Sequence, residues 1–144
     1  ALLAGEMSGH IFFNDRYYGY DDAIYAACRL IDILYTENKT IDEIFEELPK
    51  YSSTPEIKLA ISDSEKFAIV DKIKQYVQEQ NLQFSDIDGV RVKAEGGWWL
   101  VRASNTGPAI IVRIEGNDRR TCTDIVNFVK KVFTKFGLEL KIDI

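Results

Sequence analysis

Three strand-like segments separated only by short turns occupy residues 90–115, and they constrain the fold more than any other feature of the sequence. Residues 90–94 alternate apolar and basic side chains, Gly96 and Gly97 allow a tight reversal, and residues 98–103 and 108–115 are rich in β-branched and aromatic side chains. Consecutive strands joined by connections this short pair as antiparallel neighbours. The sequence therefore predicts an antiparallel sheet in this part of the chain.

Two helical patterns flank these strands. The first follows a strand-like segment at residues 56–61 and a capping-box pattern from Ser62 to Glu65, and its apolar stripe is Phe67, Val70, Ile73 and Val77. The second lies between Thr121 and Gly137, with Gly137 as the expected C′ residue, and its stripe is Ile125, Phe128, Val129, Val132, Phe133 and Phe136.

The order of elements from residue 56 onward is thus β-α-β-β-β-α. Two amphipathic helices cover one face of such a sheet efficiently, so we predict a two-layer α+β domain with an antiparallel sheet and two helices on one face. Residues 138–144 alternate as well and could add a short edge strand.

The first 49 residues follow another pattern. Asp21 or Asp22 caps a helix, and Thr40 opens a shorter one with a capping box. The stripe of the first helix, expected to be buried, is Ile24, Ala27, Cys28, Ile31, Leu34 and Tyr35. We therefore predict a helical remnant of an α/β domain at residues 1–49, a polar, proline-bounded linker at 50–55 and the α+β domain at 56–144. We expect the chain to be a fragment of a larger protein, because a polar loop follows a lead-in of only Ala1 to Ala4.

The composition narrows the class of protein. The net charge of -5 argues against general nucleic-acid binding, which needs a basic face. No apolar run reaches the roughly 20 residues that span a bilayer. The two cysteines, Cys28 and Cys122, lack the spacing of a metal site or a disulfide framework. We expect a cytoplasmic protein with neither a nucleic-acid nor a membrane partner.

The turn at residues 102–107 is rich in groups that bind anions. Arg102 offers a guanidinium, Ser104 and Thr106 offer hydroxyls, Asn105 offers an amide, and Gly107 lets the backbone approach a ligand. The same residues also suit an ordinary hairpin turn, since Asn and Gly tolerate positive φ and Pro108 starts the next segment. From composition alone, both interpretations remain open.

Two motifs carry a resemblance to a known family. The sequence GGWWLVRASNTGP resembles the phosphate-binding loop in the last domain of the α-D-phosphohexomutases, and GEMSGH at residues 5–10 resembles the sugar-binding loop of their third domain. Both occur here in the order that the family has. The resemblance implies that Arg102, Ser104, Asn105 and Thr106 grip the phosphate that is not reacting, with Gly107 beside them, and that Glu6, Ser8 and His10 contact the sugar.

The resemblance also implies a reaction. These enzymes isomerise sugar 1-phosphates and 6-phosphates through a phosphoserine, a hexose 1,6-bisphosphate intermediate and Mg²⁺. The chain has no T-x-S-H-N-P nucleophile loop and no D-x-D-x-D-R metal loop, which in the family belong to the first and second domains. We therefore expect the N-terminal domains of the parent enzyme as partners of this part. We also expect no catalytic residue, no metal site and no turnover in this part alone.

Three alternatives remain at this stage. Met7, Ala103 and Asn105 favour mannose or glucose phosphate over the glucosamine phosphate of the related phosphoglucosamine mutases. His10 could equally hydrogen-bond the backbone of its own loop. A non-enzymatic α+β module that binds RNA is the alternative of another class.

Trp98 and Trp99 are expected to face opposite sides of their strand, so that at most one of them lines a cleft.

Overall fold

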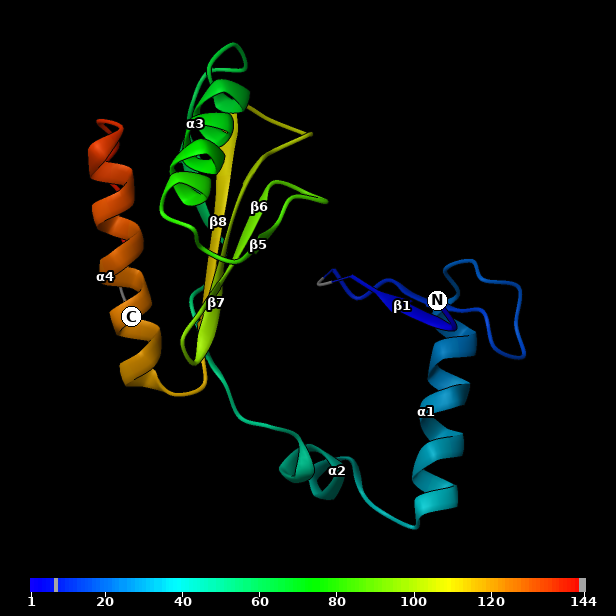
Figure 1. Ribbon diagram of the computed structural model, residues 1–144. Coiled ribbons are helices and arrows are strands. Elements are labelled where there is room, and N and C mark those ends of the chain that lie inside the picture. Colours follow the sequence, from blue (N-terminus) through cyan, green and yellow to red (C-terminus); the bar gives the residue numbers. More distant parts are fainter. Residues whose placement is uncertain (7, 143–144) are drawn as a thin grey trace. The chain divides into compact units, whose positions relative to one another are not determined.

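The computed structural model describes residues 1–6 and 8–142 of the 144-residue chain. The chain divides into two compact units, Ala1–Pro49 and Lys50–Ile144 (Figure 1). Within the described residues, no helix combines the length and apolar character that crossing a membrane requires.

The first unit consists of a two-stranded ribbon and two helices. The strands pair antiparallel, with Leu3 opposite Phe13 and Gly5 opposite Ile11. The elements are β1 (Leu3–Gly5), β2 (Ile11–Phe13), α1 (Ala23–Glu37) and α2 (Ile41–Glu47).

Both helices begin where the local sequence predicts. The carboxylate of Asp22 accepts hydrogen bonds from the backbone N–H groups of Ile24 and Tyr25, which satisfies donors that a helix N-terminus leaves free. At the start of α2, the Thr40 side chain accepts from the N–H of Glu43, and the Glu43 carboxylate accepts from the N–H of Thr40. The predicted capping box is therefore confirmed.

The packed face of α1 differs from the predicted one. Tyr25 stacks on Tyr17 with 3.7 Å between ring centroids, and it meets Phe13 edge-on. Arg29, one turn further along, binds Asp15 at 3.1 Å. The predicted stripe is exposed or half-buried in this unit: Ile24, Ala27, Cys28, Ile31, Leu34 and Tyr35. The prediction of a buried stripe is wrong here, because nothing in the described part of the first unit covers it.

The second unit is built on one antiparallel sheet with the strand order β3-β8-β7-β6-β5, and β4 pairs with β8 on the edge that β3 also uses. Its strands are β3 (Ser52–Ser53), β4 (Ile57–Ala60), β5 (Phe84–Ser85), β6 (Val90–Ala94), β7 (Gly97–Ala103) and β8 (Ala109–Gly116). The predicted strands β6, β7 and β8 form consecutive hairpins.

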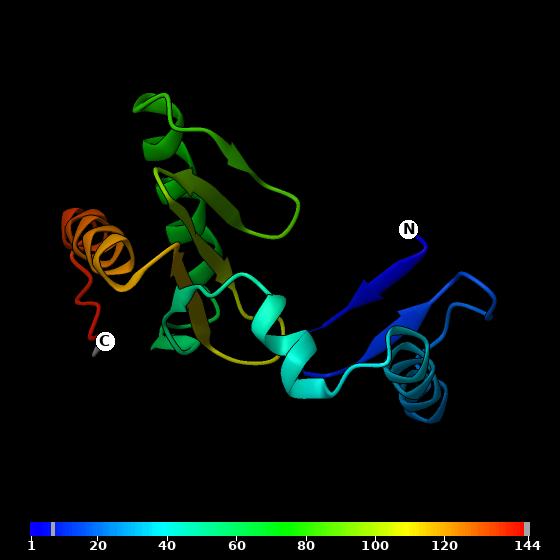
Figure 2. The same ribbon diagram turned by 90° about the horizontal axis from the view of Figure 1, so that it is seen from below.

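The helices α3 (Lys66–Glu79) and α4 (Arg119–Lys135) cover one face of this sheet (Figures 1 and 2). Their apolar stripes, except for the exposed Phe67 and Phe128, pack on the inward residues of the strands. The core includes Val70, Ile73, Val77, Val90, Val92, Trp99, Val101, Ile110, Val112, Ile114, Cys122, Ile125, Val126, Val129 and Phe133. The predicted two-layer α+β fold with two helices on one face is confirmed.

The opposite face of the sheet carries most of the charged strand residues. Strand alternation and register place on it Lys58, Arg91, Lys93, Trp98, Leu100, Arg102, Arg113 and Glu115. Trp99 is 1% exposed in the core while Trp98 lies on this outer face, as expected of strand neighbours.

Part of the predicted linker at residues 50–55 is sheet. Ser52 and Ser53 form β3, and Thr54 is 4% exposed. The backbone N–H of Thr54 donates to the carbonyl of Ile114, whose own N–H donates to the Thr54 hydroxyl. The polar Thr54 therefore satisfies the backbone of Ile114 in β8, between the parts of β8 that pair with β3 and β4, and the segment is not a free connection.

The remaining differences are at helix and strand ends. α3 begins at Lys66 without a side-chain cap, because the Ser62 hydroxyl donates to the Glu65 carboxylate instead of forming a capping box. Phe67 is 56% exposed, whereas Lys66 is buried. The described residues 138–142 form no strand, although Leu140 and Ile142 are buried in the core. Residues 143–144 of the predicted edge strand lie outside the described residues.

Candidate functional site

The polar loop that connects β7 to β8 closes a hairpin. The backbone N–H of Ser104 donates to the carbonyl of Ala109, and the N–H of Ala109 donates to the carbonyl of Gly107. Ser104 is 9% exposed, and its Oγ accepts from the N–H of Thr106 at 3.3 Å and lies 3.4 Å from Thr106 Oγ1. Asn105 and Thr106 are exposed. Two hydroxyls and an amide thus gather at one end of the sheet.

Gly107 sits in this loop without a steric requirement for glycine. Its φ is not in the positive range, and a Cβ built on it would meet nothing within 4 Å. Asn105 does not adopt positive φ either. The ordinary turn chemistry considered for these two residues is therefore not what the backbone uses here.

Arg102 reaches the same end of the sheet from β7. It pairs with Ile111 of β8 on the face opposite the helices, and its side chain is 31% exposed. Its Nη1 lies 3.7 Å from Oδ2 of Asp88, which is 67% exposed. The adjacent Gly89 has φ +74°, and a Cβ there would lie 2.3 Å from the carbonyl oxygen of Val101. Only glycine lets the turn that carries Asp88 pack this closely on β7.

The polar loop of the first unit links β1 to β2. The N–H of Glu6 donates to the carbonyl of His10, the N–H of Gly9 donates to the carbonyl of Glu6, and the Ser8 hydroxyl donates to the Glu6 carboxylate at 3.1 Å. Glu6, Ser8 and His10 are all exposed. Met7, one of the residues used to choose between sugars, lies outside the described residues.

His10 is held by a carboxylate rather than by the backbone of its own loop. Its Nδ1 lies 2.5 Å from Oδ2 of Asp21, and Oδ1 of the same carboxylate accepts from the N–H of Ile11. The hydrogen bond to Asp21 and the negative charge of Asp21 raise the pKa of His10 above its ordinary value of 6.5. Asp21 thus orients the imidazole, whose side chain remains 55% exposed.

The titration of His10 tests this arrangement. His10 is the one histidine of the chain, so its ring protons can be followed by NMR without ambiguity. We expect a pKa above 6.5 in the wild type and a lower pKa in Asp21→Asn. Because the folded-state pKa is raised, the pair stabilises the folded loop fully below pH 6.5, and this contribution is lost as the pH rises through the raised pKa. Equal pKa values in the two proteins would contradict the pairing.

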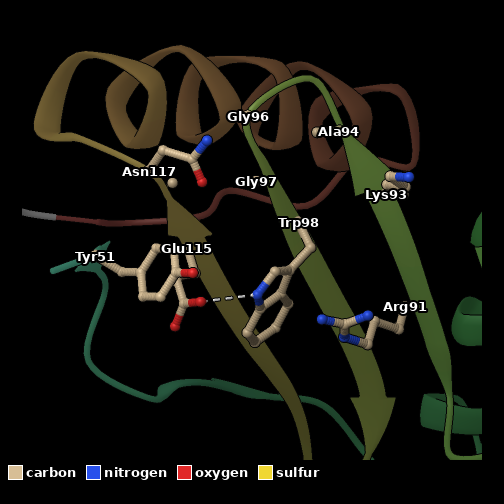
Figure 3. A pocket seen from close by; sticks show the side chains of 10 residues that line it. Tyr51, Arg91, Lys93, Ala94, Gly96, Gly97, Trp98, Glu115 and Asn117 are labelled. Atoms are coloured by element: carbon tan, nitrogen blue, oxygen red, sulfur yellow. Dashed lines mark hydrogen bonds between the residues drawn. The ribbon is translucent and has the colours of Figure 1, made fainter. Parts of the chain in front are cut away.

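A hollow of about 550 Å³ lies at the other end of β7, on the outer face of the sheet (Figure 3). Residues that line it include Tyr51, Trp98 and Glu115. Trp98 Nε1 donates to Glu115 at 3.0 Å, and the Arg91 guanidinium lies over the Trp98 ring at 4.4 Å from its centroid. Because Arg91 already covers that ring face, that face of Trp98 is closed to a stacking ligand.

The roles of three residues at these loops were not predicted from the sequence: Lys66, Asp88 and Asp21, which was considered only as a helix cap. Lys66 Nζ donates to the carbonyl oxygens of Ser104 and Gly107. A signal for Lys66 existed, since it precedes the buried Val70 and Ile73 at the i+4 and i+7 spacing of one helix face. Asp21 meets His10, and Asp88 meets Arg102, only in the folded chain, and no local pattern predicts either pair.

Residues 1–6 and 8–142 hold no group of three or more His, Cys, Asp or Glu side chains arranged to bind a metal ion. The protein therefore consists of two parts, each of which carries one polar loop. One part is an α+β domain with an arginine-bearing polar loop between two central strands, and the other is a ribbon-and-helix unit with a second polar loop.

Comparison with known proteins identifies the family. Residues 56–132 match the sequence model of the phosphoglucomutase/phosphomannomutase C-terminal domain, and residues 1–51 match that of the phosphoglucomutase/phosphomannomutase alpha/beta/alpha domain III. The chain belongs to the phosphoglucomutase/phosphomannomutase family. This confirms the predicted family over the alternative of an RNA-binding module.

Individual relatives agree with this assignment. The chain is 44% identical over 141 residues to a phosphomannomutase/phosphoglucomutase of Pseudomonas aeruginosa. The aligned residues make up 98% of this chain and 29% of the relative. It is 49% identical over 115 residues to the enzyme of the same name from Pseudomonas syringae pv. tomato, and these residues make up 80% of this chain and 25% of the relative. A crystal structure of a phosphoglucomutase/phosphomannomutase family protein from Burkholderia thailandensis matches the whole chain with a TM-score of 0.84 at 32% identity, over 30% of its own length. The chain thus spans between a quarter and a third of the length of these relatives.

Proposed function

We propose that this chain is the substrate-binding C-terminal portion of a phosphomannomutase/phosphoglucomutase, an enzyme that interconverts hexose 1-phosphate and hexose 6-phosphate. Within it, the loop from Arg102 to Gly107 holds the phosphate that is not reacting, and Glu6, Ser8 and His10 bind the sugar. The observation that carries the proposal is that Arg102, Ser104 and Thr106 lie at the same end of an otherwise ordinary sheet, in a chain of this family.

The loop has the chemistry that a phosphate monoester requires. A guanidinium forms a forked, charge-assisted pair of hydrogen bonds with two phosphate oxygens, which a single ammonium cannot reproduce. The Thr106 hydroxyl and the Asn105 amide are exposed and can donate to the same anion. Phosphoryl transfer depends largely on positioning and charge stabilisation, so a firm hold on the distal phosphate orients the sugar for reaction at its other end.

The sugar-binding loop has complementary chemistry. Glu6 accepts hydrogen bonds, whereas Ser8 both donates and accepts, so together they can hold neighbouring hydroxyls of a hexose. In the free loop the Ser8 hydroxyl donates to Glu6 at 3.1 Å, and a bound sugar hydroxyl would replace that contact. His10, oriented by Asp21, can donate a further hydrogen bond to the ligand.

The family implies Mg²⁺ and a hexose 1,6-bisphosphate intermediate. The described residues of this chain bring together no set of side chains that fits a divalent cation, so no step here is assigned to a metal ion. We propose that the nucleophile and the metal ligands belong to other domains of the parent enzyme, which act as partners of this portion.

Binding of a phosphosugar tests the proposal. The isotope-labelled chain is titrated with mannose 6-phosphate, with glucose 6-phosphate, with glucosamine 6-phosphate and with plain mannose, and backbone amides are followed by NMR. We expect the amides of residues 102–107 to shift with the phosphosugars and not with mannose, at the millimolar affinity to which about 4 kcal/mol of binding free energy corresponds. Unchanged amides throughout would overturn the proposal. Tighter binding of the glucosamine ester would favour a phosphoglucosamine mutase as the parent.

Asp88 is expected to compete with the phosphate for Arg102. Its carboxylate lies 3.7 Å from the guanidinium, so a bound phosphate must displace or share that contact. Exposed ion pairs are weak, and we therefore expect Asp88→Asn to tighten mannose 6-phosphate binding by about twofold to fivefold. Asp124→Asn removes the same charge from an exposed position on α4 and serves as the control. Weaker binding in Asp88→Asn would show that Asp88 supports the site instead.

A further inference from the structure

Lys66 is a buried lysine directly behind the candidate phosphate loop. It is the first residue of α3 and is 5% exposed. Its Nζ lies 2.7 Å from the carbonyl oxygen of Ser104, 3.1 Å from that of Gly107 and 2.6 Å from Oδ1 of Asp63. An ammonium has three hydrogens to donate, and these three acceptors account for all of them.

The two carbonyls bound by Lys66 lie at the two ends of the exposed segment that follows Ser104. All peptide bonds in the described residues are trans, so the N–H of Asn105 points away from the carbonyl of Ser104 and hence away from Lys66. Lys66 thereby turns two carbonyl oxygens inward and the backbone N–H of Asn105 outward. A carbonyl facing the other way would repel an anion.

The positive charge of Lys66 also favours an anion at the loop. The ammonium is shielded from solvent, and its counter-ion Asp63 has a side chain that is 70% exposed. A shielded positive charge is screened less by salt than an exposed one. It therefore contributes to the potential at the loop even though it does not reach the loop surface.

We infer that Lys66 is a positioning residue of the phosphate site, which holds the backbone of residues 104–107 in the conformation that accepts a phosphate monoester. This inference rests on the proposed function of the loop, and it adds a group that does not touch the ligand. The ligand class is the phosphate monoester of a hexose, and the group acts through the carbonyls of Ser104 and Gly107.

The test compares variants of Lys66 in the same phosphosugar titration of the full 144-residue chain. Lys66→Met keeps a long side chain but removes the ammonium, and we expect it to weaken mannose 6-phosphate binding about fivefold or more and to shift the Asn105 amide in the free chain. Lys66→Arg can still donate to both carbonyls and is expected to retain more of the affinity than Lys66→Met. Lys72→Met, an exposed lysine of the same helix, should bind like the wild type.

A second control distinguishes an effect of Lys66 on phosphosugar binding from an effect on the stability of the fold. Val77→Ala truncates a fully buried residue of α3 and lowers the melting temperature without touching the loop, so its affinity should stay unchanged below that temperature. Unchanged affinity in a folded Lys66→Met would overturn the inference while leaving the proposed function intact. Absence of binding by the wild type would overturn both. If neither Lys66→Met nor Lys66→Gln folds, Lys66 is a fold determinant and the positioning role is rejected.

Discussion

Arg102→Ala should weaken binding of mannose 6-phosphate by the chain about tenfold or more, because a charge-assisted, forked hydrogen bond to an anion is stronger than a neutral one. Arg102 is the cation on the outer sheet face next to the loop, and its side chain is 31% exposed and therefore accessible to a ligand. The NMR titration measures the effect directly. In the alanine variant, amide shifts of residues 102–107 should not saturate at ligand concentrations that saturate the wild type.

Two further variants make this result specific. Arg102→Lys keeps the charge but not the planar fork, so we expect most of the affinity to be lost. Arg91→Ala removes an arginine from the same sheet face beside the hollow at the other end of β7, and it should leave phosphosugar binding unchanged. If both alanine variants weaken binding equally, the effect is one of general charge and the loop is not the phosphate site.

Trp99→Ala should destabilise the second unit far more than Trp98→Ala. Trp99 is 1% exposed in the core, whereas Trp98 is half-buried on the outer face beneath Arg91. Truncation of a core tryptophan leaves a large cavity, and we expect a loss of about 3–5 kcal/mol in the free energy of unfolding. For Trp98→Ala we expect about 1 kcal/mol, from lost packing and the hydrogen bond to Glu115.

Denaturant unfolding followed by circular dichroism measures both losses. The two residues are neighbours of the same type on one strand, so each is the matched control of the other. Similar losses of unfolding free energy in the two variants would mean that Trp98 on the outer face is buried as thoroughly as Trp99 in the core. In that case, the assignment of the faces of β7 would be wrong.

The exposed stripe of α1 bears on the role of the first unit. Ile24, Ile31 and Tyr35 are 79%, 65% and 87% exposed, although their spacing is typical of a buried helix face. Residues 1–51 match an alpha/beta/alpha domain, in which helices pack on a sheet. We propose that further elements of such a domain cover this stripe in the parent enzyme.

Much of the second unit could be predicted because its signals are local. The hairpins β6-β7 and β7-β8 join segments that are adjacent in sequence, and apolar alternation distinguishes their two faces. The same holds for the caps at Asp22 and Thr40, whose partners lie within one helical turn. The polar residues of the 102–107 loop could also be recognised as candidate anion-binding groups, because they are concentrated in a short segment of the sequence.

What could not be predicted involves partners that are distant in the chain. Thr54 meets Ile114 across 60 residues, and Lys66 meets Ser104 and Gly107 across 38 and 41 residues. A polar residue such as Thr54 resembles part of a linker until folding places it beside the backbone N–H and carbonyl of Ile114 in β8, which need a partner. The spacing of Lys66 places it on the buried face of α3, but only folding brings the two carbonyls to its ammonium. Residue types and their spacing therefore identify the strands, the helices and the candidate ligand-binding groups. Which polar groups are buried and which backbone they hold follows from hydrogen bonds that exist only once the chain has folded.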